Sequence, residues 1–288
     1  MDGIILVDKK ENMTSYDVIR KVKRYFNTSK TGHCGTLDPF ATGLLIIGIN
    51  QATKVLSFLE SEYKEYEATI SFGKFYDSYD KTGNLIKEST INPFTKAKIN
   101  EVLKSFIGKS WQTPPIYSAI HVNGKRLYDY ARNNETVDIK SREIEIFDIK
   151  LLGFTNDSIS IYVKCSKGTY IRSLGVDIAK KLNNDGYLSS LRRISIGTFK
   201  ADIANKIEDF NTNSIIVHPI SEMLNIKNIV IEDEYLHKIY NGHLMNFNSD
   251  DKYLLINRKD GTSIAIYTKN DNNYRCLRGL FNEETRYK

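Results

Sequence analysis

The chain has 288 residues, of which 41% are hydrophobic and 26% charged, so its length predicts about two globular domains with sizeable cores. Its 41 Lys and Arg residues exceed its 35 Asp and Glu residues, and the net charge of +6 suits a polyanionic partner without requiring one. Three widely spaced cysteines, Cys34, Cys165 and Cys276, argue against a disulfide framework and a zinc site and favour a reducing compartment.

The first predicted element is a strand over residues 3–8. Its apolar part is flanked by Asp2 and Asp8, so it is too short and too acidic for a signal peptide. The apolar run at 44–49 predicts a buried strand and is far below the ~20 residues that span a bilayer. We therefore expect a cytoplasmic protein that does not enter a membrane.

A helix is expected between these two strands. Thr14 followed by Asp17 is typical of the capping box at a helix start, and apolar residues recur at helical spacing as far as Phe26. This spacing leaves four basic side chains on the other side of the helix: Arg20, Lys21, Lys23 and Arg24. Their basic face is either an ordinary solvated surface or a contact for RNA phosphates.

Strands and helices in the middle of the chain do not alternate regularly. The elements expected here are a strand at 63–72, a helix at 99–107 ended by Gly108, a tight turn at Asn123-Gly124, strands at 142–154 and 158–166, and a helix at 171–182. This order favours an α/β or α+β fold, with a mixed, largely antiparallel sheet flanked by helices, over a doubly wound parallel sheet.

The C-terminal part has a different character. From about Ile226, short predicted strands at 253–257, 263–267 and 274–280 are separated by polar turns. We therefore predict two domains, 1–225 and 226–288, of which the second is small and β-rich.

The segment 31–45 carries the most specific signal. Asp38 is its only carboxylate, and Gly32, Gly35 and Gly43 permit backbone angles and close approaches that other residues resist. An isolated Asp-Pro pair is most often a tight turn in which the Asp side chain caps its own backbone. The complete segment, however, resembles the catalytic loop of the TruB family of tRNA pseudouridine synthases. The family pattern is Gly-His-x-Gly-Thr-Leu-Asp-Pro-x-Ala-x-Gly, and every fixed position of it is filled here.

Further segments between residues 3 and about 200 strengthen this resemblance. Lys64-Glu65-Tyr66 is similar to the family strand whose Tyr stacks on the target base, and Gln112 to Ala119 and Cys165 to Arg172 are similar to two other family blocks. The ordinary interpretation of Tyr66 is a strand aromatic. Where the family has a Lys after the first of these blocks, this chain has His121, whose charge depends on pH.

The resemblance implies roles for particular residues. Asp38 is expected to be the catalytic carboxylate, with Arg172 paired to it and Tyr66 against the base. Tyr170 and Leu191 are expected to line the base pocket, and Asp80 to lie near the substrate. His33 is expected to fill the space that the flipped-out base leaves, the alternative being a hydrogen bond that braces the loop.

Uridine isomerisation needs no redox centre, metal or nucleotide, so the resemblance implies no cofactor, and no metal-binding spacing is present. It does need a carboxylate kept ionised in a dry pocket, which the guanidinium of Arg172 would favour. Whether Asp38 attacks the sugar, attacks the base or removes a sugar proton is left open, and Tyr66 is a candidate acceptor of the C5 proton. A glycosidase would need a second carboxylate, and the sequence places none beside Asp38.

The function predicted from these residues is isomerisation of the T-loop uridine conventionally numbered 55 in tRNA. The alternatives are a synthase for a different RNA uridine and a tRNA-folding chaperone whose binding role outweighs its chemistry. The resemblance also implies the pseudouridine-synthase type of sheet, and residues 226–288 loosely resemble a PUA-like RNA-binding module. The T arm of tRNA is the expected partner, and we expect a monomer without a protein partner or a membrane.

Overall fold

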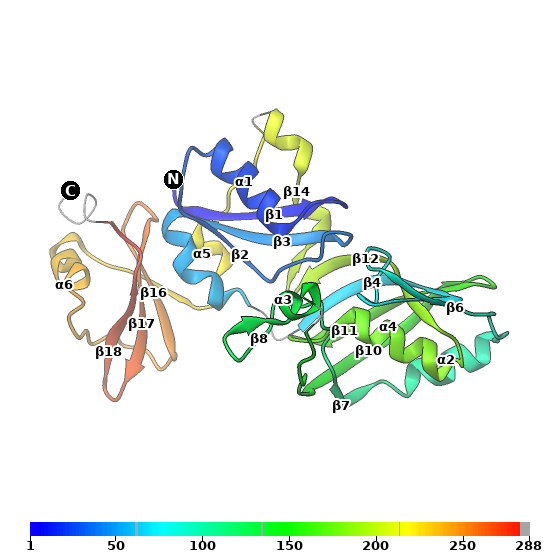
Figure 1. Cartoon of the computed structure of the whole chain (residues 1–288). Coiled ribbons are helices and arrows are strands. Elements are labelled where there is room, and N and C mark those ends of the chain that lie inside the picture. The colour runs from blue at the N-terminus through cyan, green and yellow to red at the C-terminus, as the bar shows by residue number, and fades with distance from the viewer. Residues whose placement is uncertain (61–62, 134, 213, 283–288) are drawn as a thin grey trace.

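The computed structural model describes residues 1–288 apart from 61–62, 134, 213 and 283–288. A ten-stranded sheet runs through most of the molecule, and a four-stranded sheet lies at one end of it (Figure 1). The strands of the large sheet are β1 (Gly3–Lys9), β2 (Thr31–Cys34), β3 (Thr42–Ile49), β4 (Tyr63–Phe72), β7 (Gly108–Gln112), β10 (Arg142–Phe154), β11 (Ser158–Ser166), β12 (Gly186–Ile196), β13 (Phe199–Lys200) and β14 (Asn205–Lys206).

The large sheet is mixed and mainly antiparallel. Its strands follow the order β14-β1-β3-β12-β4-β11-β10-β7, with β2 paired to β3 and β13 paired to β12. Among the pairs that the described residues form, β1 with β14 and β3 with β12 are parallel, and the others are antiparallel. The predicted fold class, an α/β or α+β protein with a largely antiparallel sheet, is therefore confirmed.

Helices cover the sheet in two places (Figure 1). The helix α1 packs its apolar side on β1 and β3, whereas α2 and α4 cover β4, β10, β11 and β12. The α-helices are α1 (Ser15–Tyr25), α2 (Lys96–Lys104), α3 (Leu127–Arg132), α4 (Ile171–Lys181), α5 (Ile220–Met223) and α6 (Leu236–Tyr240). The 3₁₀ segments are η1 (Asn50–Phe58), η2 (Ala201–Ile203), η3 (Ile207–Asn211) and η4 (Asp233–Tyr235). The short hairpin strands are β5 (Lys74–Tyr76) with β6 (Leu85–Glu88), and β8 (His121–Val122) with β9 (Lys125–Arg126).

The start of α1 has the predicted capping box. The Thr14 hydroxyl accepts a hydrogen bond from the Asp17 amide at 3.0 Å, and the Asp17 carboxylate accepts one from the Thr14 amide at 2.8 Å. The helix then buries Val18, Ile19 and Val22 against the sheet. The cap thus fixes where the helix begins, and the apolar spacing fixes which side faces inward.

Some predicted elements have different bounds. The helix predicted to continue to residue 107 ends at Lys104, since the Ser105 hydroxyl donates to the Val102 carbonyl and the next two amides bond three residues back. Gly108, with a φ of +101°, begins β7 instead of ending the helix. Residues 31–34, expected as loop, form β2 because they pair with β3. The strand β12 was not predicted from the sequence.

The four-stranded sheet has the order β15-β16-β17-β18. Its strands are β15 (Lys227–Val230), β16 (Tyr253–Asn257), β17 (Ser263–Asn270) and β18 (Asn273–Gly279). One face packs under α6, and the other contributes Leu255 and Ile266 to a core that also contains Val55 and Leu59 of the preceding part of the chain. The two sheets thus share a hydrophobic core. The predicted boundary at residue 226 stays a prediction.

Candidate active site

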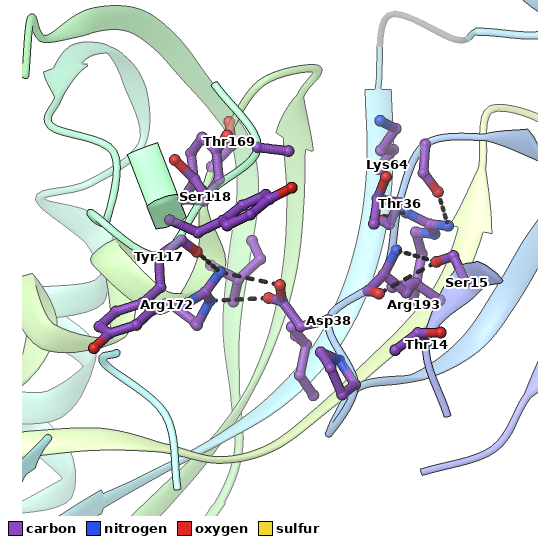
Figure 2. A pocket seen from close by; sticks show the side chains of 18 of the residues that line it. Thr14, Ser15, Thr36, Asp38, Lys64, Tyr117, Ser118, Thr169, Arg172 and Arg193 are labelled. Carbon is purple, nitrogen blue, oxygen red and sulfur yellow. Dashed lines mark hydrogen bonds and ion pairs between the residues drawn. The ribbon is translucent and has the colours of Figure 1, made fainter. Parts of the chain in front are cut away.

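A cavity of about 620 Å³ opens above the middle of the large sheet. Figure 2 shows two walls with Asp38 between them: Tyr117, Ser118, Thr169 and Arg172 lie on one side, and Thr14, Ser15, Thr36, Lys64 and Arg193 on the other. The first wall comes from the segment before β8 and the start of α4, and the second comes from α1, the β2–β3 loop, β4 and β12. A volume of this size is typical of a small-molecule or single-nucleotide pocket.

The loop that presents Asp38 is held by side chains from outside it. The Ser15 hydroxyl accepts a hydrogen bond from the Leu37 amide at 3.0 Å and donates to the Leu37 carbonyl at 3.2 Å. The ammonium group of Lys9, which is fully buried, donates to the Pro39 carbonyl at 3.2 Å and to two further carbonyls. Asp38 therefore stands on a braced loop rather than on a free turn.

Gly43 explains why the motif ends in glycine. Its φ is +102°, and a Cβ atom there would overlap the backbone of Arg193 on the parallel strand β12. Only glycine has both the conformation and the space that this close approach needs. The approach brings β3 and β12 together directly beside the Asp38 loop.

Asp38 forms a two-point ion pair with Arg172. The Nη2 atom of Arg172 donates to Oδ1 of Asp38 at 3.0 Å, and its Nε atom lies 2.9 Å from Oδ2. The Arg172 side chain is 4% exposed, whereas that of Asp38 is 34% exposed and faces the cavity. The structure thus places Arg172 against Asp38, with a carboxylate edge open to whatever enters the cavity.

The η nitrogens of Arg172 have further partners. They bond the Ser78 carbonyl at 2.9 Å and the Tyr117 carbonyl at 2.8 Å, and Nη1 lies 3.3 Å from the carboxylate of Asp80. Asp80 accepts further hydrogen bonds from the amide and hydroxyl of Thr82. The sequence did not place a second carboxylate near Asp38, but the structure puts Asp80 on the same guanidinium. Asp80 is 4% exposed and does not line the cavity, so it acts as a support for Arg172.

The environment of Asp38 pulls its pKa in two directions. Burial raises the pKa of the Asp38 carboxyl above its ordinary value, and the negative charge of Asp80 raises it further. The adjacent charge of Arg172 and its hydrogen bond to the carboxylate oppose this rise. Arg172 therefore favours the ionised form of Asp38 and opposes the rise in pKa that burial causes.

The predicted base-pocket residues meet at the cavity. Tyr66 on β4 and Leu191 on β12 are nearly buried and lie on the face of the sheet that carries the cavity. Tyr170, directly before α4, lines the cavity too, and its backbone exchanges two hydrogen bonds with the side chain of Gln112, at 2.8 and 3.1 Å. Flat and apolar walls of this kind suit an unstacked base.

His33 lies on β2 and lines the cavity. Burial lowers its pKa, and the nearby charge of Arg193 lowers it further, which favours a neutral imidazole. Its Nδ1 atom is buried and has no hydrogen-bond partner among the described residues. This arrangement favours the space-filling interpretation of His33 over a bracing hydrogen bond through that atom.

The structure does not bring the basic face of α1 into the cavity. None of its four residues lines the cavity in the described part of the chain, although Tyr16 at the start of the helix does. Arg20 pairs with Asp17 and lies 5.8 Å from the Tyr16 ring centroid. His121, the departure from the family pattern, is exposed on β8 and accepts from the Arg126 guanidinium at 3.4 Å.

Among the cavity residues, Arg193, Lys64 and Ser15 were given no role from the sequence. Arg193 follows Arg192 in the chain, and only one of two neighbouring strand residues can face the cavity. Leu191 is expected in the base pocket, and in a strand the residue two positions further on, Arg193, faces the same side. Knowing that the segment is a strand would therefore have placed Arg193 at the cavity. Among the described residues, no group of three or more His, Cys, Asp or Glu side chains is arranged to hold a metal ion.

Comparison with known proteins shows which family the chain matches. The family model for the TruB family pseudouridylate synthase (N terminal domain) matches residues 23–171. The tRNA pseudouridine synthase B of Mycoplasma capricolum subsp. capricolum is 37% identical over 286 residues, which cover 98% of each chain. That of Francisella tularensis subsp. holarctica is 42% identical over 233 residues, covering 81% of this chain and 77% of the relative.

A solved structure shows the same fold at lower identity. A chain in the crystal structure of a Cbf5-Nop10-Gar1 complex matches with a TM-score of 0.70 and 22% identity, over 99% of this chain and 86% of that one. The fold is thus that of a pseudouridine synthase. With a family match over residues 23–171 and full-length relatives at 37% identity, the chain belongs to the TruB family of pseudouridylate synthases.

Proposed function

We propose that this protein converts uridine to pseudouridine in tRNA, at the T-loop uridine conventionally numbered 55. The observation that carries the proposal is the carboxylate of Asp38, open to the cavity and paired at two points with the buried Arg172. The names of the full-length relatives, tRNA pseudouridine synthase B, support tRNA as the substrate. The T-loop position rests on the resemblance of the Asp38 loop to the family motif.

The chemistry is an exchange of one glycosidic bond for another. The bond from C1′ of the ribose to N1 breaks, the base turns, and C5 bonds to C1′. Asp38 is the group that acts at the sugar or the base, by attack at C1′, attack at the base, or removal of a sugar proton. Arg172 keeps the carboxylate ionised and aimed, while Tyr66, Leu191 and Tyr170 hold the turning base and exclude water.

A substrate uridine inside a folded loop must leave its stack to reach this cavity. We propose that His33, on the rim formed by β2, occupies the vacated space. The four-stranded sheet, with exposed Arg275 and Arg278 on β18, is proposed as the PUA-like RNA-binding module of residues 226–288. We further propose that the enzyme acts as a monomer in the cytoplasm. No helix in the described ranges is long and apolar enough to cross a membrane.

The decisive experiment maps pseudouridine in total tRNA from cells that lack this chain and from cells that regain it. We expect loss and return at T-loop position 55. Loss at a different uridine would support the alternative of a synthase with another target. Unchanged pseudouridine together with altered tRNA folding would support the chaperone alternative and overturn the proposed chemistry.

The basic face of α1 is expected to contact RNA phosphates. Replacing Lys21, Lys23 and Arg24 with Gln should weaken T-arm RNA binding and reduce the slope of log Kd against log salt by about one for each phosphate that is no longer neutralised. Titrations at several salt concentrations measure this slope. The matched control is Lys96, Lys98 and Lys104 on α2 changed to Gln, which removes the same charge from another exposed helix. Equal slopes for the two triple variants would reject the RNA contact.

Replacing His33 with Ala is expected to impair base placement more than chemistry. The neutral ring fills space and makes no bond to the sugar, so the half-saturating RNA concentration should rise, while a measurable single-turnover rate remains at saturation. Quenched-flow assays on T-arm RNA separate the two quantities. If the folded variant has no activity even at saturating RNA, His33 takes part in the chemical step and its assignment here is wrong.

A further inference from the structure

Arg193 is a buried cation that the proposed chemistry has not used. Its side chain is 1% exposed, and it makes no ion pair with a carboxylate in the part of the chain that the structure describes. Burying a guanidinium without a counter-charge is costly unless its donors are satisfied. Here each guanidinium nitrogen donates to a backbone carbonyl: Nε to Leu44 at 2.8 Å, Nη2 to Gly35 at 2.9 Å, and Nη1 to Thr36 at 3.3 Å. Arg193 is therefore fixed in place beside the Asp38 loop.

This charge lies beside Tyr66. The two residues are directly opposed in the antiparallel pairing of β12 with β4, so their side chains stand on the same face of the sheet. Both line the cavity, and the positive charge of Arg193 acts to lower the pKa of the Tyr66 phenol. Figure 2 shows Arg193 on the opposite side of Asp38 from Arg172. The site thus has two arginines with different neighbours: Arg172 is paired with the Asp38 carboxylate, and Arg193 stands beside Tyr66 on the adjacent strand.

We propose, on the basis of the proposed function, that Arg193 is a positioning residue whose charge makes the Tyr66 oxygen the acceptor of the C5 proton. After C5 has bonded to C1′, C5 still carries its hydrogen and the ring has a C6–N1 double bond. The Tyr66 phenolate takes the proton from C5, and the electron pair of the C5–H bond forms the C5–C6 double bond. The electron pair of the C6–N1 double bond moves to N1, which takes up a proton from solvent. Tyr66 then releases to solvent the proton that it took from C5.

The groups around Tyr66 explain why a cation is needed. Burial raises the pKa of the Tyr66 phenol, and the neighbouring Cys165 of β11 and the carboxylate of Asp38 raise it further. Arg193 lowers it, and Lys64, two residues away on β4, also lines the cavity. Without Arg193 the fraction of phenolate at neutral pH would fall. Proton transfer from C5 would slow as a result.

The test separates proton removal from the earlier steps. T-arm RNA carrying deuterium at C5 of the target uridine is used in single-turnover assays with wild-type protein and with Arg193→Gln. We expect the variant to be at least ~10-fold slower, to show a larger deuterium isotope effect, and to have its pH–rate profile moved to higher pH. Arg193→Lys should recover part of the rate. In a Tyr66→Phe background, Arg193→Gln should not enlarge the isotope effect further.

The matched control is Arg192→Gln, one position away on the opposite face of β12, where Arg192 pairs with Asp8 at 2.7 and 2.9 Å. This variant should keep the isotope effect and the pH profile of the wild type. A folded Arg193→Gln protein that is slow but has the isotope effect and pH profile of the wild type would overturn the proposal and leave Arg193 only a brace for the Asp38 loop. Failure of the proposed function itself would look different, because the wild-type protein would then make no pseudouridine.

A second measurement leaves Arg193 in place. Site-specific replacement of Tyr66 with 3-fluorotyrosine makes the phenol more acidic with little change in shape. The pH profile of C5 proton release should then move to lower pH. An unmoved profile would overturn the proposal even if the Arg193 variants did not fold.

Discussion

Replacing Asp38 with asparagine is expected to reduce pseudouridine formation by at least ~1000-fold while leaving T-arm RNA binding within a factor of ~3. The amide keeps the shape of the side chain but cannot attack C1′ or the base and cannot accept a sugar proton. No other carboxylate among the described residues lines the cavity, so no neighbour replaces it. Single-turnover tritium release from C5-labelled T-arm RNA measures the chemistry, and filter binding measures the affinity.

Asp8→Asn is the matched control, since Asp8 also forms a two-point pair with an arginine but lies outside the cavity. Its activity should stay close to that of the wild type. Appreciable tritium release by folded Asp38→Asn protein would refute the role of Asp38.

Asp38→Asn is also expected to change how the free energy of unfolding depends on pH. Because the pKa of Asp38 is raised in the folded protein, its share of the free energy of unfolding is present at low pH and is lost as pH rises through the folded-state value. An amide does not titrate. The difference in stability between wild type and Asp38→Asn should therefore shift in favour of the variant as pH rises, as thermal unfolding at several pH values will measure.

Arg172→Lys is expected to lower the single-turnover rate by at least ~100-fold and to move the pH–rate profile upward. The guanidinium contacts Asp38 at two points and also bonds the carbonyls of Ser78 and Tyr117, a planar pattern that a lysine ammonium cannot reproduce. A lysine would counteract the effect of burial on the pKa of Asp38 less than the arginine does. That pKa would therefore rise further, and a higher pH would be needed to ionise Asp38.

Arg192→Lys is the control for this change. It alters the same type of two-point pair, with Asp8, at a position that does not line the cavity. Its pH profile should match that of the wild type. A profile of Arg172→Lys that is lower in amplitude but unmoved along the pH axis would show that Arg172 positions the site without controlling the ionisation of Asp38.

Local patterns in the sequence predicted much of the fold. The strands at 63–72, 142–154, 158–166 and 253–257 have the predicted bounds, since alternating apolar residues and polar turns define them locally. The strand β12 escaped because apolar residues do not alternate along it: Arg193 and Ser195 are buried, whereas Ile194 between them is partly exposed. Only its pairing with β3 and β4 reveals the strand. Pairing between distant segments is tertiary information that a single sequence does not display.

The site residues also fall into two groups: those that sequence motifs mark, and those whose contacts depend on the fold. Asp38, Arg172 and Tyr66 were found because motifs mark them, and the structure brings all three to one cavity. Asp80 and Arg193 have their particular contacts only because separate elements converge, at Arg172 in one case and at the junction of β3, β12 and β4 in the other. Their charges alone gave no indication of those neighbours.

The core shared by the two sheets has a thermodynamic consequence. Leu255, Ile266 and Leu280 from the C-terminal part pack in one cluster with Val55 and Leu59. Phe58 adds an edge contact to Tyr253 with ring centroids 5.4 Å apart, and the Lys54 ammonium donates to the Gly279 carbonyl at 2.7 Å. Cutting the chain at residue 226 would uncover this apolar surface on both fragments. We therefore expect the protein to unfold as one cooperative unit. Any contribution of its last four strands to RNA binding should then be tested by exchanging surface side chains and not by truncation.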